Sequence, residues 1–178
     1  MEQRMLASSV HGSTYDRGIG IIFDTDPDDF RYFCTPVGAY VFAGTGGDGV
    51  HFCTVPEQFG DMIFIVEPMP LDEIHVRPVA QNFTDFIRVL LAVRFTGILL
   101  DIPLRTEAEF REGLQIFREQ HETEEHTEKL RHLAAYYGVT PMDDPYTYIR
   151  SLQDTFDYNL IPFSDDCYES CGLPNPNK

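Results

Sequence analysis

The sequence has few basic residues, few cysteines and no long apolar run. Its 13 lysine and arginine side chains stand against 29 carboxylates, which gives a formal net charge of −16. Without a surplus of cations to neutralise phosphates, the composition argues against unaided binding to nucleic acid or to an anionic membrane. Four cysteines in 178 residues exclude a disulfide-dense scaffold. The longest apolar region, 86–100, contains Arg88 and Arg94 and is too short to cross a bilayer.

The N-terminal residues also lack the apolar stretch of a secretory signal peptide. We therefore expect a cytoplasmic protein whose thiols are reduced. Residues 1–14 are polar and carry few signals of regular structure, so we expect them to be flexible.

The sequence does have enough apolar residues for a packed core. Hydrophobic residues make up 43% of the chain and aromatic residues 13%, which excludes wholesale disorder despite the charge. At this length we expect one globular unit. Residues 1–102 are predicted to form a core of sheet and helix, and residues 103–178 a helical appendage with an irregular tail.

The stretch 39–55 is predicted to form a β-hairpin. Two short apolar runs, 39–43 and 50–55, flank a connection at 44–49 that contains four glycines. Runs of this length bounded by turn residues are typical of adjacent antiparallel strands. The glycines permit positive φ angles, and Asp48 is expected to bond neighbouring backbone amides.

The same connection matches the dinucleotide-binding pattern G-x-G-x-x-G. In such a site a helix begins directly after the loop, because its N-terminal amides hold the pyrophosphate. Residues 50–55 are strand-like instead, so the glycines are predicted to shape a structural loop and no cofactor is expected. These glycines are Gly44, Gly46, Gly47 and Gly49.

Four more segments have the composition of strands, namely 17–23, 31–35, 62–66 and 74–79. With the hairpin they predict a sheet of five or six strands. The connections are too short for helical crossovers, which favours antiparallel pairing. Residues 62–66 are apolar throughout and are predicted to be covered on both faces, whereas the alternation in 74–79 predicts one wet face.

The clearest helix signal begins at Asn82, a favourable N-cap with Asp85 in the first turn that follows it. Apolar residues then recur at helical spacing as far as Gly97, which predicts a helix across one face of the sheet. Residues 97–100 are predicted to form a last strand or an extended segment. The expected fold class is therefore α+β, with a mostly antiparallel sheet, one helix on its face and further helices toward the C-terminus.

Three of those further helices are predicted after the core. The first begins with a capping box of Thr106 and Glu109 and runs to about residue 121. The second stops at Gly138, and the third has Pro145 in its first helical position. The tail, 158–178, is rich in turn formers and is predicted to be irregular.

Four carboxylates are concentrated near the N-terminus. Asp24, Asp26 and Asp28 have the spacing of the first ligands of a calcium-binding loop. However, Asp29 stands where that loop needs glycine, and Thr35 stands where it needs glutamate. We interpret the cluster as a solvated acidic turn.

His121 and His126 flank three glutamates and suggest a metalloprotease motif at first sight. Two histidines share one helical face when they are four positions apart, whereas these are five apart. The segment is therefore predicted to be a solvated acidic connection between helices.

The four cysteines allow a second metal hypothesis. If the tail folded back over the sheet, Cys167 and Cys171 could join Cys34 and Cys53 in a four-thiolate zinc site. We favour the interpretation that Cys34 and Cys53 are small buried hydrophobes and that the tail pair are free thiols.

Asp48 and His51 lie near the same end of the hairpin and could form an acid–base pair. Asp48 is expected to shape the turn, and no nucleophile with a fitting context is present. We therefore predict no catalytic residue and no metal ligand.

The segment FAGTGGDGVHFCTV, followed by IFIVEPM and VRPVAQNFTDFIRVLL, resembles the SUKH superfamily, which includes SMI1/KNR4-type proteins. The resemblance covers about residues 38–95, and its motifs specify a fold. The helical LG-x-x-LP phrase with which relatives usually begin is missing from residues 1–37. The matching positions are Phe42, Thr45, Gly46, Gly47, Asp48, Gly49, the segment 66–69, Val79, Ala80, Phe83, Asp85 and Phe86.

This resemblance implies a non-enzymatic binding protein. Many relatives are immunity proteins that neutralise toxins, often nucleases, by direct contact, and an acidic chain suits a basic protein partner. The alternatives are a regulatory or small-ligand-binding scaffold, and a metal-dependent hydrolase that uses His51, Asp48 or the tail cysteines. The predicted partner-binding residues are Asp24, Asp26, Asp28, Asp29 and Asp48.

Overall fold

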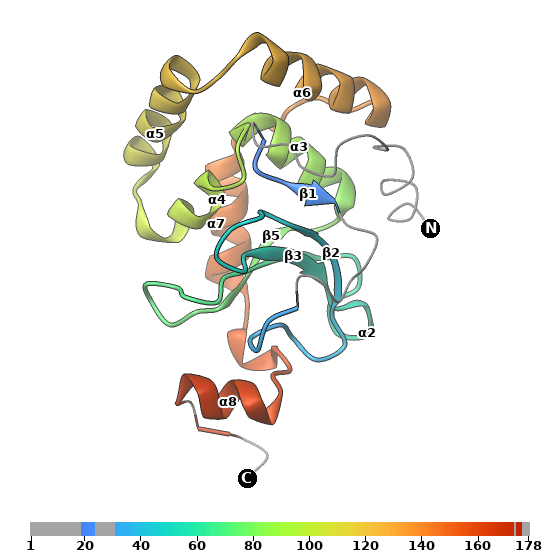
Figure 1. Ribbon diagram of the computed structural model, residues 1–178, viewed down its shortest axis with the longest axis vertical. Helices are drawn as coiled ribbons and strands as arrows, with labels where there is room; N and C mark the ends of the chain where they lie inside the picture. The colour runs from blue at the N-terminus through green and yellow to red at the C-terminus, as the bar shows by residue number, and fades with distance from the viewer. Residues whose placement is uncertain (1–18, 24–30, 173, 176–178) are drawn as a thin grey trace.

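The computed structural model describes residues 19–23, 31–172 and 174–175, and it shows an α+β fold (Figure 1). Its sheet has five antiparallel strands, and the strand order in space follows the order in the chain. The predicted fold class is therefore confirmed. The strands are β1 (Ile22–Phe23), β2 (Tyr40–Gly44), β3 (His51–Thr54), β4 (Ile63–Val66) and β5 (Val76–Ala80).

The predicted hairpin is formed by β2 and β3. Tyr40 lies opposite Thr54, and a β-bulge shifts the register between Val41 and Ala43. A strand and not a helix follows the glycine-rich loop, so the dinucleotide-binding geometry is absent from this part of the described chain. The hairpin loop is closed by Thr45, whose hydroxyl donates to the carbonyls of Gly47 (3.1 Å) and Val50 (3.2 Å).

Two glycines of this loop, Gly46 and Gly49, have positive φ angles of 78° and 71°. Asp48 also has a positive φ, 53°, and its side chain is exposed. The prediction that Asp48 holds the turn is not what the structure shows, because the hydroxyl of Thr45 supplies the side-chain hydrogen bonds there.

The strand predicted at 31–35 is wrong. These residues form a turn in which the Thr35 amide donates to the Tyr32 carbonyl (2.9 Å) and the Tyr32 amide donates to the Thr35 hydroxyl (2.8 Å). The Arg31 guanidinium donates to the Ala39 carbonyl (2.7 Å) and so ties the turn to the residue before β2. These local bonds replace the pairing that a strand would need.

Of the strand predicted at 17–23, only Ile22–Phe23 among the described residues form β1, which pairs with the end of β2. Strand β4 is buried at each position, as predicted. The wet face predicted for 74–79 is wrong, since β5 is buried throughout. Even Arg77, in β5, is only 5% exposed, because its guanidinium pairs with Asp72 and donates to the Ile74 carbonyl (2.6 Å).

A short helix, α2 (Pro56–Phe59), joins β3 to β4, and the predicted long helix is α3 (Phe83–Val93). The Asn82 side chain accepts from the Asp85 amide (2.9 Å), which confirms the predicted N-cap. Helix α3 ends earlier than predicted, at Arg94, which has a left-handed backbone with a φ of 65°.

The strand or extended segment predicted at 97–100 is also wrong. The chain forms α4 (Ile98–Asp101) and then η1 (Ile102–Leu104). The Leu99 amide donates to the Thr96 carbonyl (3.0 Å), which starts the helical turn. A short apolar run fits a buried helix as well as a strand, so the local pattern could not decide between them.

The three predicted C-terminal helices are present as α5 (Glu107–Gln120), α6 (Glu124–Tyr137) and α7 (Pro145–Thr155). The capping box of Thr106 and Glu109 is formed, and Gly138 ends α6 in a left-handed conformation. Helices α5 and α6 lie at one end of the molecule, and α7 runs beside the sheet (Figure 1).

The tail predicted to be irregular contains η2 (Tyr158–Leu160) and α8 (Asp165–Cys171). The Ser164 hydroxyl accepts from the Cys167 amide (3.2 Å), and Gly172 closes the helix with a left-handed backbone. Helix α8 lies at the opposite end of the molecule from α5 and α6 (Figure 1).

Buried apolar residues form two clusters, one on each face of the sheet. Successive strand residues point to opposite faces, and Phe52 belongs to the first cluster whereas Cys53 belongs to the second. The first cluster contains Phe86 of α3 and Ile149 of α7, and the second contains Cys167 of α8. None of the helices in the described residues is both long and apolar enough to span a membrane.

Candidate functional site

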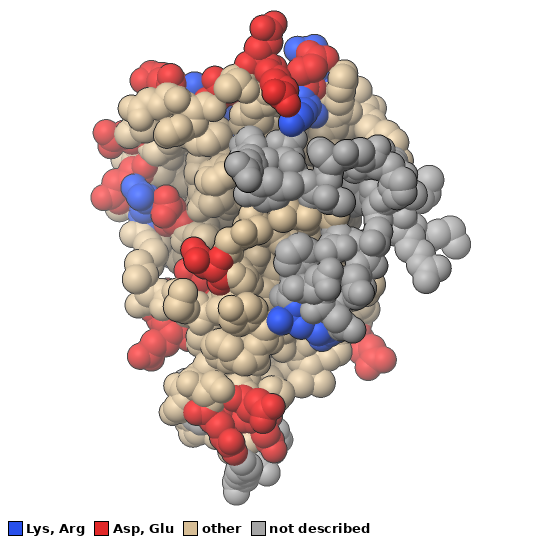
Figure 2. Space-filling view, in the orientation of Figure 1, with Lys and Arg blue, Asp and Glu red and all other residues tan. Residues whose placement is uncertain are grey.

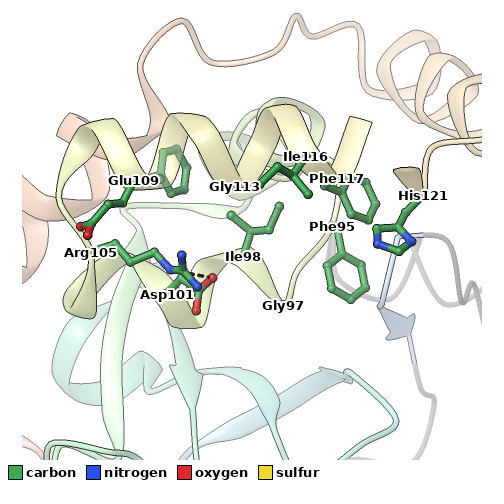
Figure 3. A pocket seen from close by; sticks show the side chains of 11 residues that line it. Phe95, Gly97, Ile98, Asp101, Arg105, Glu109, Gly113, Ile116, Phe117 and His121 are labelled. Atoms are coloured by element: carbon green, nitrogen blue, oxygen red, sulfur yellow. Dashed lines mark ion pairs between the residues drawn. The ribbon is translucent and has the colours of Figure 1, made fainter. Parts of the chain in front are cut away.

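A pocket of about 380 Å³ lies between α4 and α5 (Figure 3). Two of its walls come from residues within 95–101 and 109–117, two segments that residues 102–108 connect. The rings of Phe95 and Phe117 stack with centroids 5.2 Å apart and an interplanar angle of 12°. Together with Ile98 and Ile116 they give the pocket an apolar lining, and Ile116 is 43% exposed.

The rim of the pocket is charged. Asp101 and Arg105 form an ion pair at 3.1 Å (Figure 3). Glu109 accepts from the Thr106 amide (2.8 Å) and hydroxyl (2.7 Å), and these hydrogen bonds lower the pKa of its carboxyl group. Glu109 is therefore charged at neutral pH, and the cationic Arg105 is already paired.

The open volume of the pocket depends on glycine. A Cβ atom added to Gly113 would meet no heavy atom within 4 Å, although Gly113 lines the pocket. A Cβ atom at Gly97 would lie 2.4 Å from Phe95 Cε1. A side chain at 113 would therefore extend into open space, whereas one at 97 would collide with the ring of Phe95.

We expect Gly113→Ala to raise the free energy of unfolding by about 0.5–1 kcal/mol, because glycine in a helix interior costs about that much relative to alanine. The added methyl group has no atom to displace. Urea denaturation of the purified chain measures the change. Gly97→Ala is the contrasting variant, and we expect it to lower stability. Equal effects of the two substitutions would contradict the described packing.

The chain has no significant match among protein-family models, curated proteins or solved structures. The resemblance to the SUKH superfamily therefore stays a prediction. The residues on which it rests lie in the stretch from β2 to α3, both in these strands and helix and in the loops between them.

The predicted partner-binding residues are not brought together with the pocket. Asp24, Asp26, Asp28 and Asp29 lie outside the described residues. Asp48 is exposed in the loop between β2 and β3 and does not line the pocket.

His51 is fully buried and has two hydrogen-bond partners. Its Nδ1 lies 2.7 Å from the Gly49 carbonyl, which can only accept, so Nδ1 carries the proton. Its Nε2 then accepts from the Thr35 hydroxyl at 3.0 Å. Both ring nitrogens are thus used within the fold, and the acid–base pair with Asp48 is not formed. Burial lowers the pKa of His51 from 6.5, and the Gly49 carbonyl opposes that shift.

We expect His51 to make the fold less stable in mild acid. Because the folded protein binds a proton at His51 less readily than the unfolded chain does, stability falls as the pH drops below about 6.5, the unfolded value. His51→Gln should flatten the loss of stability between neutral and mildly acidic pH. Urea midpoints across that range measure it, with His132→Gln, an exposed site, as the control. Identical pH profiles for wild type and His51→Gln would contradict the argument.

The segment between His121 and His126 is only partly the solvated connection that the sequence predicts. His121 is exposed, but His126 is buried and donates from Nε2 to the Arg94 carbonyl (2.8 Å). Glu122 pairs with the Arg94 guanidinium. These contacts join the end of α3 to the start of α6, so the segment has a structural role.

All four cysteines are free thiols, and Cys34 and Cys53 are buried as predicted. Cys167 is also fully buried, and its Sγ lies 3.9 Å from that of Cys171. Cys171 Sγ lies 3.3 Å from His75 Nε2. The tail pair are free thiols as predicted, and α8 packs both of them against the second apolar cluster.

The sequence reasoning missed the pocket. Phe110, Leu114 and Phe117 recur at helical spacing and form an apolar stripe, and the one available signal was that Ile116 lies outside it. An exposed isoleucine one turn from a glycine, such as Ile116 near Gly113, is consistent with a pocket on that face of α5. The sequence could not predict that α4 forms the other wall of the pocket.

Proposed function

We propose that the chain is a protein-binding module whose partner presents a basic surface, and that the pocket between α4 and α5 receives an apolar side chain of that partner. The observation that carries this proposal is that the chain's own cations are largely neutralised. The following side chains form ion pairs with carboxylates of the same chain: Arg77, Arg88, Arg94, Arg105, Arg111, Lys129, Arg131 and Arg150.

A large surplus of carboxylates is left over. The sequence has 29 acidic and 13 basic side chains, so most of the carboxylates remain without a basic partner even if each basic side chain forms an ion pair. Figure 2 shows acidic side chains near both ends of the molecule, with few basic ones between them. Such a surface repels nucleic acid and attracts basic proteins, whose association it accelerates at low salt.

The pocket supplies what charge alone cannot, a place for an apolar anchor. Protein interfaces gain most of their energy from a few large side chains that fill pockets and exclude water. Here the apolar walls of Phe95, Ile98 and Phe117 are bordered by Asp101, and the exposed Glu112 lies on the same helix as Phe117. An aliphatic or aromatic residue flanked by lysine or arginine fits this arrangement.

The resemblance to the SUKH superfamily points to the same class of partner. Immunity proteins of that group cover toxins, and a nuclease toxin carries a basic substrate-binding face. We therefore propose neutralisation of such a toxin by direct contact, with no chemical step on this chain.

The test couples the full chain to a resin and exposes it to a lysate of the source cells and to candidate toxins from neighbouring reading frames. We expect a basic protein to bind at 0.1 M salt and to be released at 1 M, where screening shortens the Debye length from about 10 Å to about 3 Å. Gly113→Met, which fills the pocket, should weaken binding at least about tenfold. Ala108→Met adds the same side chain to an exposed position of α5 that does not line the pocket, and should leave binding unchanged.

Two results would reject the proposal. If no basic protein binds at low salt, the electrostatic account is wrong. If Gly113→Met binds the partner as well as Ala108→Met does, the pocket takes no part in the interface.

A small-ligand regulatory module is the second candidate, because a volume of about 380 Å³ can hold a small organic molecule. The site lies between helices α4 and α5. A screen of apolar fragments by protein NMR decides this candidate. Saturable shifts of the Gly113 amide would support it, and their absence would reject it.

A further inference from the structure

Helix α8 carries two thiols on one face. Cys167 and Cys171 are four positions apart, so they lie one turn from each other on the same side of the helix. Their Sγ atoms are 3.9 Å apart. The two thiols differ in exposure, because Cys167 is fully buried whereas Cys171 is partly exposed. Of the two, Cys171 is the thiol that a small molecule in solvent can reach.

An imidazole lies beside the more exposed thiol. His75 precedes β5, and its Nε2 lies 3.3 Å from Cys171 Sγ. Its Nδ1 lies 3.1 Å from the Glu67 carbonyl oxygen, which can only accept, so Nδ1 carries the proton and Nε2 accepts from the Cys171 thiol. The Phe33 ring packs edge-on against the imidazole, with the ring centroids 5.9 Å apart. His75 is thus held in the tautomer and orientation in which it can take up the thiol proton.

This arrangement combines the features of a redox-active thiol. The thiolate is the form of cysteine that acts as a nucleophile, so a base in contact with the thiol speeds its reactions. Redox-sensing cysteines are accessible to solvent and often lie beside a second thiol that forms a disulfide with the oxidised sulfur. Cys171 has the base, the exposure and the neighbouring thiol. Burial raises the pKa of Cys167 to about 12, so Cys167 is protonated at neutral pH and is not the thiol that attacks an oxidant.

We propose that Cys171 is a modification site for hydroperoxides, with His75 as its base, and that Cys167 then converts the oxidised sulfur to a disulfide within α8. The site lies with α8, at the opposite end of the molecule from α5, which forms one wall of the pocket (Figure 1). It does not rest on the proposed partner, so failure of either proposal leaves the other standing.

The reaction has two steps. In the first, His75 Nε2 takes the Cys171 proton, and the sulfur attacks one peroxide oxygen. An S–O bond forms as the O–O bond breaks, the leaving oxygen takes the proton from His75, and Cys171 becomes a sulfenic acid. In the second, Cys167 Sγ attacks Cys171 Sγ, the S–O bond breaks, and the departing hydroxide takes the Cys167 proton. Two thiols are thus oxidised to one disulfide while the hydroperoxide is reduced to an alcohol, or to water, and a further water is released.

The disulfide requires a change in the last turn of α8. Cβ atoms four positions apart on a helix are about 5–6 Å from each other, whereas those of a disulfide are about 3.5–4.5 Å apart. Cys171 is the last residue of α8, and Gly172 follows it with a left-handed backbone. Only the final turn therefore has to tighten, and oxidation is expected to draw Cys171 away from His75.

The experiment treats the reduced full chain with excess hydrogen peroxide, stops the reaction with catalase, and alkylates the remaining thiols in denaturant. Trypsin cleaves after lysine and arginine but not before proline. It therefore releases the two α8 thiols together on peptide 151–178 and the other two cysteines together on peptide 32–88. Mass spectrometry then counts the labels on each peptide.

We expect peptide 151–178 to lose both labels, together with two hydrogen atoms, at least about tenfold faster than peptide 32–88 loses a label. Peptide 32–88 is the internal control, since its Cys34 and Cys53 are both fully buried. Dithiothreitol should restore both labels on peptide 151–178, which distinguishes a disulfide from irreversible oxidation.

A set of variants separates the two steps. Cys167→Ser should stop the reaction at the sulfenic acid, which dimedone labels at Cys171. In that background, His75→Gln should slow the labelling at least about tenfold, because a positioned base is worth about 100-fold or more and a free thiol ionises partly on its own. His132→Gln, at an exposed site, is the matched control and should not change the rate. Circular dichroism confirms that each variant is folded.

Three results would overturn the proposal. The first is that peptide 151–178 keeps its labels as long as peptide 32–88 does. The second is a disulfide that joins the two peptides, since Cys167 would then not be the thiol that reacts with the oxidised sulfur. The third is equal labelling rates for the His75→Gln and His132→Gln chains, since the imidazole beside Cys171 would then take no part in the reaction.

Discussion

Phe86→Ala should lower the free energy of unfolding by about 3–5 kcal/mol, the usual cost of deleting a buried phenylalanine ring. Phe86 is fully buried, and its ring contacts those of Phe42, Phe52 and Phe83 at centroid distances of 5.7, 5.1 and 6.0 Å. Truncation leaves a cavity between α3 and the hairpin that these rings cannot fill. Urea denaturation monitored by circular dichroism gives the change directly.

Thr84→Ala is the control on the same helix, one turn or less from the ring but exposed to solvent. Surface substitutions of this kind usually stay within about 0.5 kcal/mol. If Phe86→Ala costs no more than Thr84→Ala, α3 does not pack on the sheet through this residue, and the described core would be wrong.

The second large effect is expected at the other end of the chain. Ile149→Ala should cost about 2–5 kcal/mol, because Ile149 is fully buried in the first apolar cluster together with residues of the sheet. Tyr148, beside it, donates to Asp85 of α3 (3.1 Å) and accepts from the Gln81 amide (2.9 Å). We expect a single unfolding transition whose midpoint temperature is lowered in the variant, because α7 and the sheet share this cluster.

This substitution tests the prediction that residues 103–178 belong to the same globular unit as the core. Differential scanning calorimetry separates the possibilities, with the exposed Ser151→Ala as the control on the same helix. Two transitions, of which only one moves in Ile149→Ala, would show that the helical part unfolds independently.

The elements that the sequence predicts well are those whose ends are defined by local chemistry. Asn82 and Thr106 cap helices through bonds to amides three residues ahead, and Gly138 supplies a left-handed stop. The hairpin between β2 and β3 belongs to the same class, since its glycines and its flanking apolar runs are neighbours in the chain. In each case the deciding contact lies within a few residues.

The errors occur where distant contacts decide the local structure. The turn at 31–35 is held to the sheet by the Thr35 hydroxyl, which bonds His51 of β3, 16 residues further along the chain. Ile98–Asp101 is helical although its apolar run equally suits a strand. Helix α8 forms in a segment full of turn residues, where Ser164 caps it and burial of Cys167 against the sheet stabilises it. The residue pattern within each of these segments does not indicate which distant elements pack against it.

The pocket and the contact between α8 and the sheet could not be predicted for the same reason. Phe95 and Phe117 are separated by 21 residues in sequence, and their stacking depends on how α5 returns over α4. His75 and Cys171 are 96 residues apart. The sequence shows that Cys167 and Cys171 are four positions apart. Only the tertiary fold places His75 next to Cys171.

The strands lie in the sheet in the same order as in the chain, and this order affects how the protein folds during synthesis. Each strand pairs with the one synthesised just before it, so loop-closure costs stay small and the sheet can grow by successive hairpins as the chain leaves the ribosome. Both faces of that nascent sheet are apolar, however. Helix α3 covers part of the first face soon after the sheet is made, but Ile149 and Cys167, which complete the two clusters, are translated well after all five strands. The interval before α7 and α8 emerge is therefore when the newborn chain is most exposed to aggregation and most dependent on chaperones.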